Sequence, residues 1–157
     1  MYHSGYEPDV SEEGAHADGP DRGVSRLVTS LARAGVEPGA NVYAELGSTW
    51  YLMLRRPREA AHVLGKLLLA VGEDRILWGT DSVWYGAPQR LIDAFRAFRI
   101  PESMQERFGY PALTDTAKAK ILGVNASRLY DLDLTAVGNP DADWLPAARD
   151  ELGSRLA

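Results

Sequence analysis

Three side chains in this sequence combine residue types that support metal and proton chemistry. Asp81 follows a short apolar run and a glycine in the stretch ILWGTDSVWYG, His3 stands before a Ser-Gly turn in YHSGYE, and Glu45 lies near the end of NVYAEL. A carboxylate can bind a divalent ion and still accept a proton, and a neutral imidazole is a good zinc ligand. A fold that brings Asp81 and His3 together would therefore create a candidate hydrolytic site.

Asp81 has a functional and a structural interpretation. In parallel α/β proteins, functional side chains gather where strands end and loops begin. Gly79 permits close approach of backbone or ligand, and Thr80 and Ser82 could donate hydrogen bonds that keep the carboxylate ionised. The alternative is that Asp81 caps a helix or a turn.

The other titratable candidates also have two interpretations. A terminal histidine such as His3 is commonly solvated rather than functional. Strand alternation alone does not decide whether Glu45 points into a site or onto an outer wall. His62 lies in the middle of an apolar helix, which favours a packed or solvated side chain over a ligand. His16 lies among acidic residues, where a solvated loop is favoured over a weak cation site.

Aromatic residues follow both candidate strand ends. Trp50 and Tyr51 come after the first, and Trp84 and Tyr85 come after the second. They could line an apolar substrate pocket, or they could pack beneath loops.

The elements that must position these residues alternate along the chain. Apolar periodicity and turn residues predict strands near 41–46 and 75–78, and helices near 22–34, 57–71 and after Pro88. Parallel strands need long crossover connections, so this order predicts an α/β fold with parallel strands. The right-handed crossover rule places the helices near 22–34 and 57–71 on the same outer side.

The last third of the sequence predicts short helices only. They lie near 102–108, near 115–122 and after Asn125. The tail from Gly138 is polar, with an amphipathic end at 144–156.

Composition narrows the function classes. The chain has 157 residues, 45% of them hydrophobic, a formal net charge of -5 and no cysteine. It has no long Lys/Arg cluster to neutralise phosphates, so nucleic acid is not an expected partner. The absence of cysteine excludes disulfides and thiolate metal sites and suits the cytoplasm. We find neither a signal peptide nor a membrane span, so no membrane association is expected.

Four stretches carry a family resemblance: YHSGYE, NVYAELGSTW, DRILWGTDSVWYG and KILGVNASRLYDLD. Together they resemble the C-terminal part of the amidohydrolase-2 family, metal-dependent (β/α)8 barrels, over residues 1–133. The resemblance thus implies a division into part of a barrel, residues 1–133, and a C-terminal tail, residues 134–157. The resemblance places His3 at the end of the sixth barrel strand, NVYAEL in the seventh and ILWGTD in the eighth. It implies that Asp81 and His3 are catalytic residues and metal ligands, with zinc as the expected ion and manganese as the alternative.

The resemblance also implies that this chain is incomplete. The His-x-His pair of the first strand and a mid-barrel ligand have no counterpart here, whereas a catalytic zinc keeps three protein ligands. A (β/α)8 barrel takes about 250 residues. We therefore expect part of a metal-dependent hydrolase of small molecules, inactive alone, with strand edges exposed to self-association.

Two alternatives to this function stay open. The family also includes non-oxidative decarboxylases, and a full-length relative of this chain could belong to that branch. The chain could instead be a non-catalytic fragment or an interaction module that keeps the α/β packing. An unrelated doubly wound domain is a weaker possibility, because the sequence has no Gly-rich phosphate loop.

Overall fold

The structure, a computed structural model, describes residues 2–133. It divides into two units, Met1–Ala126 and Ser127–Ala157. The described residues of the second unit include the last part of helix α8 (Asn125–Leu129). After this helix, the Leu132 N–H donates a hydrogen bond to the Ser127 carbonyl at 2.8 Å. The predicted tail 134–157 lies outside the described residues. All of the predicted α/β elements fall in the first unit.

The first unit contains one parallel strand pair. β1 (Ala44–Glu45) pairs with β2 (Ile76–Leu77), with Ala44 opposite Ile76 and Glu45 opposite Leu77. The predicted parallel pairing is confirmed, although both strands are shorter than predicted. Beyond β2, the Trp78 N–H bonds to the Ile121 carbonyl, at 3.0 Å, instead of to a strand.

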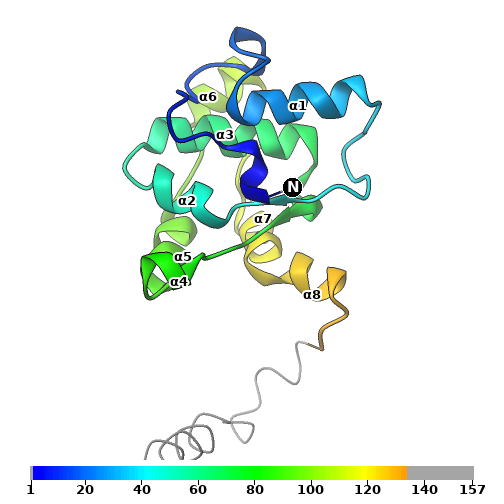
Figure 1. The fold of residues 1–157 in the computed structure, drawn as a ribbon. Helices are drawn as coiled ribbons and strands as arrows, with labels where there is room; N and C mark the ends of the chain where they lie inside the picture. Colours follow the sequence, from blue (N-terminus) through cyan, green and yellow to red (C-terminus); the bar gives the residue numbers. More distant parts are fainter. Residues whose placement is uncertain (1, 134–157) are drawn as a thin grey trace, which may run out of the picture. The chain divides into compact units, whose positions relative to one another are not determined.

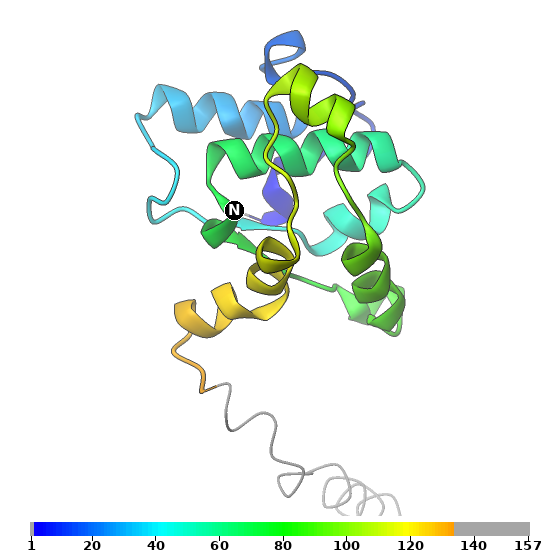
Figure 2. The ribbon, with the colours of Figure 1, turned by 180° about the vertical axis from the view of Figure 1, so that it is seen from behind.

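Two long helices cover the same side of this sheet, as the crossover rule predicts. They are α1 (Gly23–Arg33) and α3 (Pro57–Ala70), and α3 forms the connection between the strands (Figures 1 and 2). Val24 and Leu27 of α1 and Val63 and Leu64 of α3 are buried in the core. Their spacing is the helical apolar periodicity that predicted both elements.

A buried ion pair fixes the polar N-terminal loop to these helices. Lys66 Nζ lies 3.2 Å from Glu12 Oε2, and both side chains are almost fully buried. Glu12 Oε1 also accepts the Val24 N–H at 2.7 Å. A Cβ on Gly23 would overlap with Glu12 Oε1, so this position requires glycine. Removing one partner of such a pair leaves an uncompensated buried charge, typically a cost of about 3–5 kcal/mol.

The remaining elements are short. The predicted helix after Pro88 appears as α5 (Gln89–Ala97). The predicted helices of the last third appear as α6 (Glu102–Phe108), as α7 (Asp115–Ala119) continued by the π-helix η4 (Lys120–Val124), and as α8. Two helices were not predicted, α2 (Gly47–Met53) and α4 (Ser82–Tyr85). The part of the chain that the structure describes also contains three 3₁₀ segments: η1 (Tyr2–Gly5), η2 (His16–Asp18) and η3 (Glu73–Arg75).

The structure corrects one detail of the predicted barrel. Residues 2–5 form the 3₁₀ segment η1 and not the end of a sixth strand. His3 and Ser4 have φ values of 48° and 52°, which lie in the left-handed region and exclude strand backbone. The described residues thus form a two-stranded α/β unit and not a closed barrel. Within residues 2–133, no helix has the length and apolar character to cross a bilayer.

Candidate active site

Asp81 is turned away from the helix that it precedes. It occupies the position before α4, yet its side chain makes no capping hydrogen bond there. Its carboxylate instead accepts a hydrogen bond from Ser48 Oγ, at 2.5 Å from Oδ2. The helix-cap interpretation of Asp81 therefore does not describe this side chain.

The donor to Asp81 differs from the two that the sequence suggested. Ser48 lies in the first turn of α2, directly after the strand next to Asp81's own. Thr80 Oγ1 instead accepts the Ser82 N–H, at 3.3 Å. Tyr85 OH donates to Ser48 Oγ at 2.9 Å, which extends the chain of hydroxyls toward Asp81. A polar residue after the neighbouring parallel strand was the signal that could have found Ser48.

His3 is held by β1 and α2. Its backbone N–H donates to Glu45 Oε2 at 3.2 Å, and its carbonyl accepts from Thr49 Oγ1 at 2.8 Å. The neighbouring Ser4 Oγ donates to the Glu45 carbonyl at 2.8 Å. η1 thus fixes His3 beside the end of β1, without a strand of its own.

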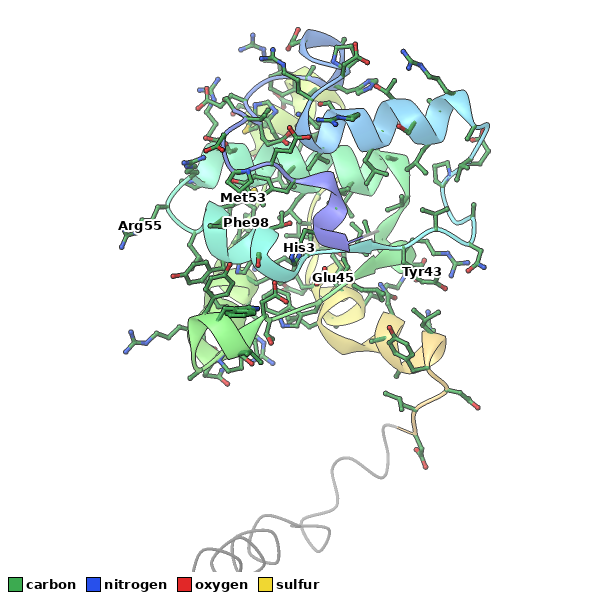
Figure 3. All side chains as sticks on the ribbon, viewed as in Figure 1. His3, Tyr43, Glu45, Met53, Arg55 and Phe98 are labelled. Atoms are coloured by element: carbon green, nitrogen blue, oxygen red, sulfur yellow. The ribbon has the colours of Figure 1, made fainter. Side chains whose placement is uncertain are left out.

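The structure brings His3, Glu45 and Asp81 into one cluster, which we call the His3 cluster. Figure 3 labels His3 and Glu45. His3 Nε2 lies 3.5 Å from Asp81 Oδ2, and His3 Nδ1 lies 3.3 Å from Glu45 Oε2. The side chains of His3, Glu45 and Asp81 are 25%, 26% and 22% exposed. Glu45 therefore points into the candidate site, and the imidazole lies between two carboxylates that solvent can reach.

Gly79 explains why the apolar run of β2 stops at a glycine before Asp81. A Cβ on Gly79 would overlap with Glu45 Oε1. The Glu45 carboxylate occupies this space and also accepts the Gly47 N–H. A Cβ on Gly47 would likewise collide with the His3 imidazole. Both strand-end glycines are required so that the cluster can pack closely.

Backbone strain is concentrated at the same place. Four non-glycine residues of the described chain have positive φ, and three of them are His3, Ser4 and Asp81. Residues in this region cost about 1–3 kcal/mol and persist where the surroundings hold them. The contacts of His3 and Asp81 supply that restraint.

The cluster fits a divalent ion in its donor types but supplies too few ligands. Two ligands about 2.0–2.1 Å from one tetrahedral zinc ion lie about 3.3–3.4 Å apart, close to the spacing of His3 Nε2 and Asp81 Oδ2. Glu45 faces the other imidazole nitrogen. Within residues 2–133, no three His, Cys, Asp or Glu side chains are arranged to hold a metal together. The described chain therefore offers two candidate ligands and not a complete catalytic zinc site.

The other candidate residues lie elsewhere. His16 Nε2 contacts Thr29 Oγ1 at 2.8 Å. His62 is fully buried, as the packed interpretation predicts, and its Nδ1 lies 2.9 Å from Tyr110 OH. Burial, followed by the charge of Lys66, lowers the pKa of His62 to about 4. These two histidines are structural.

The aromatic residues after the strands separate into core and surface. Trp50 is buried and donates its indole N–H to the Leu91 carbonyl at 3.0 Å. Tyr51 stacks on Tyr85, with ring centroids 3.7 Å apart. Trp84 is 80% exposed. Tyr85 is the member of this group whose hydroxyl reaches the site, through Ser48.

Fold and site together define an α/β protein with histidine and carboxylate groups gathered at the carboxyl ends of parallel strands. The family model described as Amidohydrolase matches residues 14–132, most of the chain. The chain belongs to the amidohydrolase-2 family. His3 lies before the matched region, whereas Glu45, Ser48 and Asp81 lie within it. No curated protein and no solved structure matches the chain.

Proposed function

We propose that this chain forms part of a hydrolase of the amidohydrolase type, in which its residues activate water for attack on a small-molecule substrate. The observation that carries the proposal is the approach of His3 to Asp81 at the carboxyl ends of β1 and β2. Family membership supports a hydrolase-type function. We further propose that β1 and β2 are the seventh and eighth strands of a (β/α)8 barrel.

In this proposal, Asp81 is the group that takes the proton from the attacking water. Its carboxylate is ordered by Ser48 and remains open to solvent, so a water molecule can reach it. A carboxylate that accepts this proton can pass it on to the leaving group, as general acid–base catalysis requires.

His3 and Glu45 have linked roles. Because the Glu45 carboxylate faces Nδ1, it favours the imidazole tautomer with the proton on that nitrogen. The lone pair of Nε2 then faces Asp81. A carboxylate behind a ligating histidine fixes the ring and raises its basicity. We assign Glu45 as the positioning residue of His3.

His3 and Asp81 are also the residues that would hold a divalent ion, with zinc or manganese as the candidates. Such an ion lowers the pKa of bound water and polarises a carbonyl group. A catalytic zinc centre with three protein ligands would need one more ligand than these two residues supply. Two ligands alone should bind zinc weakly.

A zinc titration against a fluorescent chelator tests the proposal. Asp81→Asn and His3→Gln should each weaken zinc binding at least about tenfold. Loss of a residue that only hydrogen-bonds a metal ligand already lowers metal affinity by about tenfold or more, and loss of the ligand itself should lower it at least as much. The matched controls are Asp93→Asn on α5 and His16→Gln, which lie outside the His3 cluster. Equal zinc affinity in all five proteins would contradict the assignment.

A non-catalytic role is the second candidate function, favoured by the lack of a third ligand among the described residues. Turnover separates the two. A panel of amides, esters and aromatic acids should be assayed with added zinc or manganese. Release of amine or alcohol that Asp81→Asn abolishes would support hydrolysis. Release of carbon dioxide would support the decarboxylase branch. A lack of both, together with equal zinc affinity of the parent chain and the Asp81→Asn variant, would support the non-catalytic role.

A further inference from the structure

A concave site lies in the first unit, apart from the His3 cluster. A cavity of about 450 Å³ opens between the start of α3, the end of α5 and α6. Phe98 forms part of its wall (Figure 3). The size is within the range of about 300–1,000 Å³ that small-molecule pockets have. None of its lining residues belongs to the His3 cluster.

The charge of this cavity is opposite to that of the chain. Three of its nine lining residues are Arg58, Arg99 and Arg107, and none of the nine is acidic. The chain as a whole has a formal net charge of -5. Three guanidinium groups around one cavity in an acidic protein favour an anionic ligand.

The existing partners of these arginines leave them available. Arg99 Nη1 donates to the carbonyls of Arg96 and Phe98, at 2.8 and 3.0 Å, which fixes its guanidinium in place. Its carboxylate partner Asp115, at 3.1 Å, is 84% exposed. Arg58 lies 3.9 Å from Glu13, and both side chains are exposed. Exposed pairs of this kind contribute only about 0–1 kcal/mol, so a bound anion can displace them.

The apolar part of the cavity wall is held by core contacts. Pro57, Phe98, Met104 and Phe108 line it. The Phe98 ring packs edge-on against the buried Trp50, with centroids 5.4 Å apart, and Phe108 stacks on Tyr110 at the same centroid distance. These core contacts preorganise the walls, which reduces the ordering cost of binding.

We propose that this cavity binds an organic carboxylate, with the anionic group held by Arg58 and Arg107 and the apolar body against Phe98, Met104 and Phe108. The planar guanidinium matches a carboxylate in two parallel hydrogen bonds. Phosphate sites characteristically add a glycine-rich nest of backbone N–H groups. No glycine lines this cavity, which favours the carboxylate.

Calorimetric titration of the full chain with 2-naphthoate, without added metal, tests this proposal. The neutral 2-naphthamide has the same apolar body and should bind at least about tenfold more weakly, since charge-assisted hydrogen bonds are the stronger ones. Arg107→Gln and Arg58→Gln should each weaken 2-naphthoate binding at least about fivefold. Arg90→Gln on α5, outside the cavity, should bind as the parent chain does.

The proposal is overturned if 2-naphthoate does not saturate the protein, or if the amide binds equally well. It is also overturned if Arg107→Gln and Arg58→Gln keep full affinity while melting as the parent chain does. Tighter binding of inorganic phosphate than of 2-naphthoate would reject the carboxylate as the ligand class. Because these arginines are exposed, the variants should fold, and thermal melts verify this. The titration needs neither metal nor turnover, so its outcome is independent of the proposed hydrolase function.

Discussion

At the scale of single residues, the candidate site depends on side chains that hold other side chains. Asp81 has one hydrogen-bond donor in Ser48, and Ser48 in turn accepts from Tyr85. His3 is placed by backbone and side-chain contacts with Glu45. Substitution of the outer residues therefore tests the arrangement without removing the reactive groups.

Ser48→Ala should weaken zinc binding by about tenfold, because a hydrogen bond to a charged group contributes about 1.5–3 kcal/mol. Tyr85→Phe should have a smaller effect, and none in the Ser48→Ala background, because Tyr85 acts through Ser48. The same chelator titration measures both effects. Ser82→Ala is the control. The sequence suggested the Ser82 hydroxyl as a donor to Asp81, but the carboxylate accepts its hydrogen bond from Ser48 instead. Identical affinities for Ser48→Ala and Ser82→Ala would make Ser48 a merely structural residue.

Gly79→Ala should destabilise the chain by about 1–3 kcal/mol, the usual cost of overpacking, because the new methyl group displaces the Glu45 carboxylate. Urea denaturation measures the change. Gly123→Ala is the control, because a Cβ at that position meets nothing within 4 Å. Adding Glu45→Ala to Gly79→Ala should restore part of the lost stability. Additive losses in the double variant would show that the two residues do not compete for space.

The sequence alone indicated the candidate site residues better than the residues that hold them. Asp81 was singled out because it follows an apolar run. His62 was interpreted as packed or solvated, and the structure shows it packed. Ser48 was missed because its contact crosses from α2 to the loop after β2, which only tertiary structure creates. The direction of Glu45 was also undecidable, since a two-residue strand carries almost no alternation pattern.

At the scale of elements, amphipathic helices were predictable and short ones were not. α1 and α3 match the predicted ranges closely because each buries a long apolar face. α2 was missed, although Leu46, Trp50 and Met53 are buried at helical spacing. The β-prone residues 41–46 directly before α2 predicted a strand followed by a loop.

The pH dependence of stability should report on the packing of α3. The pKa of His62 is lowered from 6.5 to about 4 by burial and then by the positive charges of Lys66 and Arg58. As the pH falls, the unfolded chain therefore takes up this proton first. The contribution is fully present above pH 6.5 and is lost progressively as the pH falls toward 4.

Urea denaturation at several pH values between 6.5 and 4 measures how steeply the free energy of unfolding changes with pH. His62→Gln can keep a hydrogen bond to Tyr110 and cannot titrate, so its stability should fall less steeply with pH than that of the parent chain. His16→Gln, which changes a histidine outside the core, should keep the parent slope. Parallel slopes for His62→Gln and the parent chain would show that His62 does not titrate in this way.

At the scale of the whole molecule, the sequence predicted exposed strand edges, and the structure places partners along them. Ser4 Oγ bonds to the Glu45 carbonyl of β1, and the Trp78 N–H after β2 bonds to the Ile121 carbonyl of η4. The exposed apolar surface instead includes Val83 and Trp84 of α4, 89% and 80% exposed. Contiguous exposed apolar side chains commonly mark an association surface.

We propose that the chain self-associates, and that Val83 and Trp84 contribute more to this than the strand edges do. Light scattering coupled to size exclusion, over a wide range of protein concentration, should show a mass that rises with concentration. The Val83→Ser, Trp84→Ser double variant should shift the chain toward the monomer, because both side chains lie at the surface and their removal costs little packing. Leu69→Ser, at another exposed apolar position, is the control and should associate as the parent chain does. A parent chain that stays monomeric at every concentration would reject self-association. A double variant that associates as the parent chain does would indicate that the edges of β1 and β2, and not Val83 and Trp84, drive self-association.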